Sequence, residues 1–215
     1  MQMLREVFEF FLHIDDALKQ LTSTYGNWTY AILGMVIFCE TGLVITPFLP
    51  GDSLLFAAGA IAADPTAGLS PVILYLIVTV MAILGDSVNY TIGSRFGVKI
   101  FDLNLPFVKR EYLDRANAFY AKHGAKMIVM ARFVPIVRTF APFAAGIAKM
   151  DYKTFITYNV VGGFVWTTLF VWAGYFFGNL PFVQNNFELV ALAIVVLSIV
   201  PIIFEWIQAR GKKAE

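Results

Sequence analysis

Hydrophobic residues follow one another along most of this chain, in stretches that few polar positions interrupt. A helix that crosses a bilayer needs about 20 mostly apolar residues. Four stretches meet that length: 28–46, 70–93, 154–178 and 189–207. They predict four membrane-spanning helices in an all-α integral membrane protein.

Two further apolar stretches, 47–63 and 127–148, are broken by residues that a straight helix disfavours. The breaking residues are Pro47, Pro50, Gly51, Pro135 and Pro142. Broken helices are tolerated at membrane depth where they face protein or a water-filled cavity. We therefore predict two opposed re-entrant helical hairpins, with two kinked full spans as the alternative.

The two broken stretches are related by an internal repeat. Each ends in the tetrapeptide FAAG, at 56–59 and at 143–146, and leads into a span that ends in a Gly-x-x-x-Gly spacing. The four glycines of these spacings are Gly93, Gly97, Gly174 and Gly178. The repetition predicts an inverted repeat, with halves at 28–93 and 127–178. Interrupted segments at matching positions in two halves are typical of a transport site near the middle of the membrane.

The N-terminal residues 1–27 have a different pattern. Their apolar residues recur at helical spacing, with charged residues on the other face: Leu4, Val7, Phe8, Phe11, Ile14, Leu18 and Leu21. This pattern predicts an amphipathic helix, which either lies on the membrane surface or packs on the rest of the protein. Its acidic residues interrupt the apolar run, so we expect no cleavable signal peptide.

The basic residues predict the orientation in the membrane. Of 16 Lys and Arg, seven lie in 94–126 and three in 209–215, whereas 64–69 and 179–188 contain none. Because cytoplasmic loops are enriched in Lys and Arg, both termini and the basic segment 94–126 are predicted to be cytoplasmic. The segment 94–126 is also predicted to include a surface helix.

Composition agrees with a single membrane domain over residues 1–215. The chain is 59% hydrophobic and 14% charged, compared with about 45–50% and about 25% in soluble domains. The net charge of +1 and the absence of a zinc-ligand or nucleic-acid motif give no reason to expect nucleic acid, a metal or a cofactor. The single Cys39 excludes an intrachain disulfide.

Four charged residues within the apolar stretches are the candidates for function: Glu40, Asp52, Arg132 and Arg138. A charge at the bilayer centre costs about 3 kcal/mol, so each needs a partner or a function. Guanidinium forks suit a phosphate or carboxylate, and desolvated acids can take up protons. We predict that the arginines bind an anionic substrate and that the acids couple protons to its release. Salt bridges that hold the two hairpins together are the alternative.

Asp86, in the stretch GDSVNYTIG, is an accessory candidate for the same network. It lies near the end of a predicted span, where contact with water explains it more simply. We therefore expect it to be solvated.

Four stretches of this sequence resemble bacterial DedA family proteins, which belong to the wider VTT or SNARE-associated group. They are FCETGLVITPFLPGDSLLFAAGA, GDSVNYTIGSRFG, FYAKHGAKMIVMARFVPIVRTFAPFAAG and YNVVGGFVW. The family's essential acids correspond to Glu40 and Asp52, and its essential arginines to Arg132 and Arg138. The resemblance implies facing re-entrant hairpins and recycling of undecaprenyl phosphate across the bacterial inner membrane, driven by the proton motive force. Eukaryotic relatives are lipid scramblases.

We accordingly expect a proton-linked carrier of a polyprenyl-phosphate lipid rather than an enzyme, with protons and membrane lipids as its other partners. Self-association into a homo-oligomer is left open. A lipid phosphatase that uses two histidines is disfavoured, because the two histidines of the chain, His13 and His123, lie outside both hairpins. Two further candidate functions are proton-coupled export of small ions or drugs, and membrane assembly by a factor that transports nothing.

Overall fold

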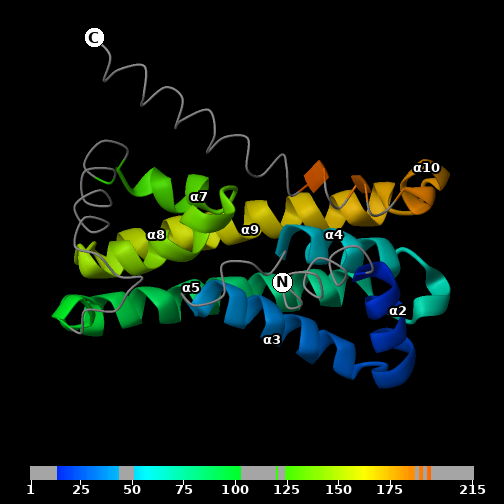
Figure 1. Ribbon diagram of the computed structural model, residues 1–215, viewed down its shortest axis with the longest axis horizontal. Coiled ribbons are helices and arrows are strands. Elements are labelled where there is room, and N and C mark those ends of the chain that lie inside the picture. The colour runs from blue at the N-terminus through cyan, green and yellow to red at the C-terminus, as the bar shows by residue number, and fades with distance from the viewer. Residues whose placement is uncertain are drawn as a thin grey trace, which may run out of the picture. The chain divides into compact units, whose positions relative to one another are not determined.

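The computed structural model describes residues 14–43, 51–102, 120, 124–186, 189–190 and 193–194, and within them every regular element is helical (Figure 1). The elements are α2 (Ile14–Tyr25), α3 (Trp28–Gly42), α4 (Gly51–Ala62), η1 (Pro65–Ala67), α5 (Pro71–Asp102), η2 (Gly124–Lys126), α7 (Met127–Ala131), α8 (Pro135–Ile147), α9 (Tyr152–Phe177) and α10 (Pro181–Asn185). The predicted all-α class is confirmed for this part of the chain.

The described residues fall into two compact units, and several helices contribute to both. The first unit takes those within Met1–Ala31, Pro50–Tyr75 and Thr167–Glu215. The second unit takes those within Ile32–Leu49 and Leu76–Trp166.

Within the described residues, two helices are long and apolar enough to cross a membrane, over Pro71–Phe96 of α5 and Tyr152–Phe177 of α9. Each of these segments has 26 residues, which is about 39 Å of helix at 1.5 Å per residue. They correspond to the predicted spans 70–93 and 154–178. The predicted span 28–46 is helical over Trp28–Gly42, and 189–207 lies outside the described residues except for four positions. The count of four spans stays a prediction.

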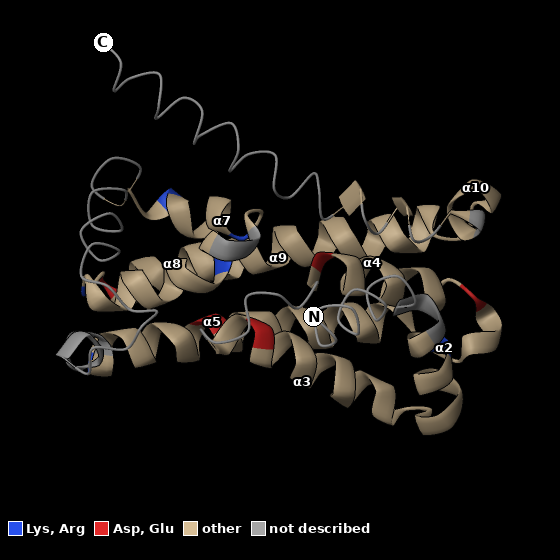
Figure 2. Cartoon of the chain, viewed as in Figure 1, with Lys and Arg blue, Asp and Glu red and all other residues tan. Residues whose placement is uncertain are grey.

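Up to Val88, the outward face of α5 is apolar, and several of the helix's polar residues are buried. Large apolar side chains are exposed at every fourth position: Val72, Leu76, Val80, Leu84 and Val88. Thr79, Asp86 and Asn89 of the same helix are buried. A helix in water has the opposite arrangement. Figure 2 shows α5 and α9 almost free of charged residues along most of their length, which agrees with an apolar surrounding.

In the second unit, α8 packs against α5 through two glycines. A Cβ added to Gly93 would lie 2.2 Å from the Phe143 carbonyl oxygen, and one added to Gly146 would lie 2.1 Å from the Tyr90 carbonyl oxygen. Helices approach this closely only where small residues face the neighbouring backbone. The glycine at the end of the second FAAG thus fastens α8 to the long helix of the first half.

The first unit contains the same pair of contacts between α4 and α9. A Cβ added to Gly174 would lie 1.9 Å from the Phe56 carbonyl oxygen, and one added to Gly59 would lie 2.1 Å from the Val171 carbonyl oxygen. In both units the phenylalanine of FAAG faces the glycine of the long helix, and the glycine of FAAG faces the residue three positions earlier. The repeat seen in the sequence is therefore also a repeat of contacts. The two helices that contain FAAG, α4 and α8, are called the FAAG helices, and each packs on the long helix of the other half, α9 and α5 respectively.

The second broken stretch turns at the first of its two prolines, as predicted, but not at the second. The chain leaves the helical conformation between α7 and α8, where Val134 is extended (φ −124°, ψ 102°), and α8 begins at Pro135. Pro142 lies inside α8, so the predicted break at Pro142 is wrong. Proline has no N–H to donate to the carbonyl four residues earlier, but packing of α8 on both sides of this position keeps the helix continuous. Buried Met127 and Ala131 of α7 pack with Ala141 of α8.

The first broken stretch is described from Gly51, the first residue of α4. Pro47 and Pro50 lie outside the described residues. All 12 residues of α4 are buried. The loop that follows is exposed, and there the Asp64 side chain accepts hydrogen bonds from the Thr66 N–H (2.8 Å) and hydroxyl (2.7 Å). These bonds hold the pKa of Asp64 below its ordinary value.

Two expectations for segments predicted to be cytoplasmic are revised or remain open. Helix α5 continues to Asp102, nine residues beyond the predicted end at residue 93, because Gly93 is a packing contact and not a helix terminus. Residues 1–13 and 103–119 lie outside the described part of the chain, so the N-terminal amphipathic helix is seen only as α2, and most of the surface helix predicted within 94–126 is not described.

Candidate functional site

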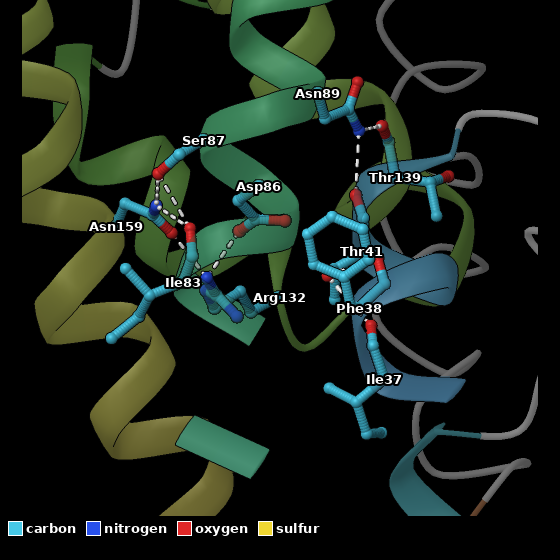
Figure 3. Close-up of polar contacts among 10 residues, drawn as sticks. All are labelled: Ile37, Phe38, Thr41, Ile83, Asp86, Ser87, Asn89, Arg132, Thr139 and Asn159. Atoms are coloured by element: carbon cyan, nitrogen blue, oxygen red, sulfur yellow. Dashed lines mark hydrogen bonds and ion pairs between the residues drawn. The ribbon is translucent and has the colours of Figure 1, made fainter. Parts of the chain in front are cut away.

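Arg132 lies at the turn between α7 and α8, where it is the C-cap residue of α7. Its side chain is 1% exposed. The terminal nitrogen Nη2 donates to Oδ2 of Asp86 on α5 and, over 2.5 Å, to Oδ1 of Asn159 on α9 (Figure 3). The arginine thus connects the turn to two long helices, through one charged and one neutral acceptor.

Asn159 is held in place by α5. Its Nδ2 donates to the Ile83 carbonyl oxygen at 3.0 Å and to the Ser87 hydroxyl at 3.3 Å. One turn along the same face of α9, Gly162 leaves room for the arginine, since a Cβ there would lie 3.0 Å from the Arg132 Cδ. The α9 backbone is therefore part of the wall around Arg132.

Arg138 lies in α8 and pairs with a different acid. Its Nη2 donates to Oε1 of Glu40 on α3, and its guanidinium carbon is 5.0 Å from the centre of the Trp166 ring. The side chains of Arg138 and Glu40 are 2% and 0% exposed. Charge and aromatic face both favour the guanidinium at this position.

Asn89 bridges three helices beside these pairs. Its Nδ2 donates to the Thr41 carbonyl oxygen of α3 at 3.0 Å and to the Thr139 carbonyl oxygen of α8 at 2.8 Å (Figure 3). Thr41 and Thr139 directly follow Glu40 and Arg138 in the sequence. The amide of Asn89 therefore fixes the two backbone segments that position the second ion pair.

The resulting cluster contains two acids and two arginines, and it is electrically neutral when all four are charged. Glu40, Asp86, Arg132 and Arg138 are all at most 2% exposed. Removing one member of a buried pair leaves an uncompensated charge and costs about 3–5 kcal/mol. The four residues therefore behave as a set, and any change in one alters the electrostatics of the others.

Asp52 belongs to the first unit, not to this cluster's unit. It is 5% exposed and occupies the first turn of α4, where the helix dipole favours a carboxylate. The expectation that Asp86 is solvated is wrong, because Asp86 is buried and pairs with Arg132. Its place at a predicted span end gave the wrong answer, since α5 continues well beyond it.

Several site residues were not singled out from the sequence. Asn159, Gly162 and Trp166 recur at positions i, i+3 and i+7 of α9, all within YNVVGGFVW, and this spacing places them on one helix face. Asn89 lies one turn after Asp86. Polar or small residues that repeat at helical spacing inside an apolar run are the signal that could have found them. Among the described residues, no group of three or more His, Cys, Asp or Glu is placed to hold a metal ion.

Comparison with known proteins places these residues in a family. Residues 49–176 match the VTT domain. Protein DedA of Escherichia coli (strain K12) is 52% identical over 215 residues, which cover 100% of this chain and 97% of that protein. An uncharacterized membrane protein of Mycobacterium tuberculosis (strain ATCC 25618 / H37Rv) is 42% identical over 178 residues, 82% of this chain and 78% of the relative.

Inner membrane protein YqjA of Escherichia coli (strain K12) is 31% identical over 176 residues, 81% of this chain and 79% of that protein. No solved structure is significantly similar to this chain. The membrane location in these relatives' names agrees with the apolar outward faces of α5 and α9. The chain belongs to the DedA family of VTT-domain membrane proteins.

Proposed function

We propose that this protein carries a polyprenyl-phosphate lipid, specifically undecaprenyl phosphate, from the outer to the inner leaflet of the bacterial inner membrane, without chemical conversion of the lipid. One observation supports the proposal above all others. Two buried arginines, Arg132 and Arg138, are held by carboxylates in a helical unit whose long helices expose large apolar side chains. A lipid phosphate is an anion that a membrane itself supplies, and the guanidinium group matches its oxygens.

The proposal includes the topology predicted from the sequence, with four spans and two re-entrant hairpins. Helices α4 and α8 have 12 and 13 residues, about 18 and 20 Å at 1.5 Å per residue. The hydrocarbon core of a bilayer is about 30 Å thick, so neither helix crosses it alone. Their lengths favour hairpins over kinked full spans.

Proton coupling is the second part of the proposal, with Glu40 and Asp52 as the proton-binding residues. On the acidic periplasmic side, protonated Glu40 holds Arg138 less strongly and leaves it available to the lipid phosphate. On the cytoplasmic side, proton loss restores the carboxylate, which competes for Arg138 and releases the lipid. Asp52, buried at the start of α4, is the corresponding proton site in the first unit.

The decisive experiment is reconstitution into liposomes with undecaprenyl phosphate and a readout that distinguishes the two leaflets. We expect transport that an imposed pH gradient accelerates, and we expect Glu40→Gln and Asp52→Asn to remain folded but to lose this acceleration. Undecaprenol, which lacks the phosphate, is the matched substrate control. Rates that ignore the gradient, with both variants active, would leave passive scrambling as the function.

The same vesicles distinguish lipid transport from the competing functions. Release of inorganic phosphate would indicate a lipid phosphatase. Proton-dependent efflux of a cationic drug, with the lipid left in place, would indicate an exporter. A protein that moves neither lipid nor drug would be an assembly factor that acts by contact.

A further inference from the structure

The guanidinium of Arg132 has two edges that can grip an oxyanion with parallel hydrogen bonds. One edge is formed by Nε and Nη2, and the other by Nη1 and Nη2. Both edges include Nη2, so an anion that binds Arg132 in this two-point manner requires one hydrogen of that nitrogen.

Both hydrogens of Nη2 are already in use. One is donated to Oδ2 of Asp86 and the other to Oδ1 of Asn159 (Figure 3). By contrast, Nε and Nη1 of Arg132 and Oδ1 of Asp86 are buried and make no hydrogen bond to the part of the chain that the structure describes. Within the described residues, two of the three donor nitrogens of this buried arginine therefore lack a hydrogen-bond partner, and each buried donor without a partner costs free energy. The spare donors on either side of an occupied nitrogen are those that an entering oxyanion needs.

We propose that Asp86 and Asn159 are internal ligands of Arg132 that stand in for the substrate phosphate, and that Asp86 competes directly with it. This inference rests on the proposed lipid-phosphate function. An oxyanion that enters the cluster takes over Nη2 together with Nε or Nη1, and Asp86 gives up its bond. Asp86 is therefore a specificity-determining residue, because its carboxylate sets how strongly an anion must bind to reach Arg132.

The two internal ligands differ in how firmly they are held. Asn159 makes two further hydrogen bonds through its Nδ2, to the Ile83 carbonyl and the Ser87 hydroxyl. The second oxygen of Asp86 has no such bond within the described residues. Rotation of Asp86 away from Nη2 thus breaks one interaction, whereas displacement of Asn159 breaks three. Asp86 is the ligand that leaves, and Asn159 remains to orient the guanidinium.

The test is equilibrium binding of farnesyl phosphate, a soluble prenyl phosphate, to the purified full-length protein in detergent. An amide accepts a weaker hydrogen bond than a carboxylate and does not repel an anion, so Asp86→Asn should bind the probe about tenfold more tightly, which corresponds to about 1.4 kcal/mol. Asn159→Asp adds a second competing carboxylate and should weaken binding by a similar factor, and it also removes the two hydrogen bonds that the Asn159 Nδ2 donates.

Inorganic phosphate and farnesol distinguish the source of the anion. Binding of inorganic phosphate with the same ranking of variants would mean that the site recognises any phosphate, and a ranking seen with farnesyl phosphate alone would assign it to a lipid headgroup. Farnesol should bind all variants equally.

Thermal unfolding is measured for each variant, so that loss of folding is not mistaken for loss of binding. A folded Asp86→Asn with unchanged or weaker affinity would overturn the inference and leave the ion pair a structural one. If Asp86→Asn does not fold, an unchanged affinity in Asn159→Asp overturns it instead. If the native protein binds the probe and all folded variants bind it equally well, the result contradicts this inference but not the proposed function. Absence of binding in the native protein and in Asp86→Asn contradicts the proposed function as well.

Discussion

In the second unit, each of the two buried arginines is stabilised by an acidic residue and by a neutral residue. Each guanidinium contacts one carboxylate and one neutral group from another helix: Asp86 and Asn159 for Arg132, and Glu40 and Trp166 for Arg138. The neutral partner fixes the plane of the guanidinium, and the acid balances its charge. In the proposed exchange of Asp86 for a phosphate, the neutral partner would keep the guanidinium in its position.

At this scale, Arg138→Lys should retain the fold but lose most lipid transport, by about tenfold or more. An ammonium group is a point charge that cannot grip a phosphate with two parallel bonds or lie flat on the Trp166 ring. Transport in proteoliposomes measures the effect, and Arg95→Lys, at an exposed position of α5, is the matched control. Full activity in Arg138→Lys would mean that the arginine acts only as a positive charge.

Asn89→Ala should lower the free energy of unfolding by about 1–3 kcal/mol, since it removes the donor shared by two buried carbonyl groups on α3 and α8. Thermal unfolding in detergent reports the change. Thr91→Ala is the comparison, because its hydroxyl bonds the Ser87 carbonyl within α5 (2.7 Å) and joins no other helix. Equal effects of the two substitutions would show that the bridge between helices has no special importance.

At the scale of helices, the fold depends on four close approaches between a FAAG helix and a long helix. The contacts of Gly59 and Gly174 in the first unit repeat those of Gly146 and Gly93 in the second. In each case a glycine lies against a backbone carbonyl, which cannot move aside as a side chain can. The repeat therefore preserves a docking geometry, while the polar residues around it differ: Asp52 lies in the first turn of α4, and Arg138 lies in α8.

Gly174→Ala and Gly93→Ala should each destabilise the protein by about 3 kcal/mol or more, because overpacking against backbone has no easy relief. Gly34→Ala serves as the control: a Cβ there would approach the Cγ2 of Ile77 at 2.9 Å, and a side-chain terminus can shift. Melting temperatures in detergent should fall far more for the first two variants. A similar, small effect at all three positions would contradict the close docking of the helices.

At the scale of the whole molecule, the arrangement of charge predicts an orientation in the membrane. Loop 64–69 is free of Lys and Arg and follows α4, whereas the basic residues gather in 94–126 and 209–215. Asp64, exposed in that loop, is held ionised by Thr66 and suits an aqueous face. Helix α5 connects the loop 64–69 to the basic segment 94–126, and α9 leads to 179–188, which also contains no Lys or Arg.

In a variant that lacks Cys39, an impermeant maleimide applied to intact cells should label Thr66→Cys. Asn104→Cys should react only after the membrane is permeabilised. Residue 66 is exposed, so lack of labelling cannot be ascribed to burial. The reverse pattern would invert the predicted topology and place the basic segment outside.

The sequence by itself determined the features that depend on composition and local order. Long apolar stretches set the helical class and the two long helices, because a helix makes its backbone hydrogen bonds within one segment, as an apolar surrounding requires. The four charges at Glu40, Asp52, Arg132 and Arg138 were conspicuous because a charge within an apolar stretch requires either a partner or a function. The FAAG repeat also predicted two equivalent helices.

Only the tertiary structure decided which groups meet. Arg132 pairs with Asp86, a residue that its sequence position made look solvated, because α5 extends past the expected end and buries it. The second broken stretch turns at Val134 and Pro135, as predicted, but stays helical through Pro142, since packing on α5 outweighs the local cost of a proline inside a helix. The exchange of FAAG helices between halves, too, is a long-range contact that residue order does not specify. A local sequence pattern indicates which structures a segment can adopt, whereas the close packing of distant segments determines which residues contact one another.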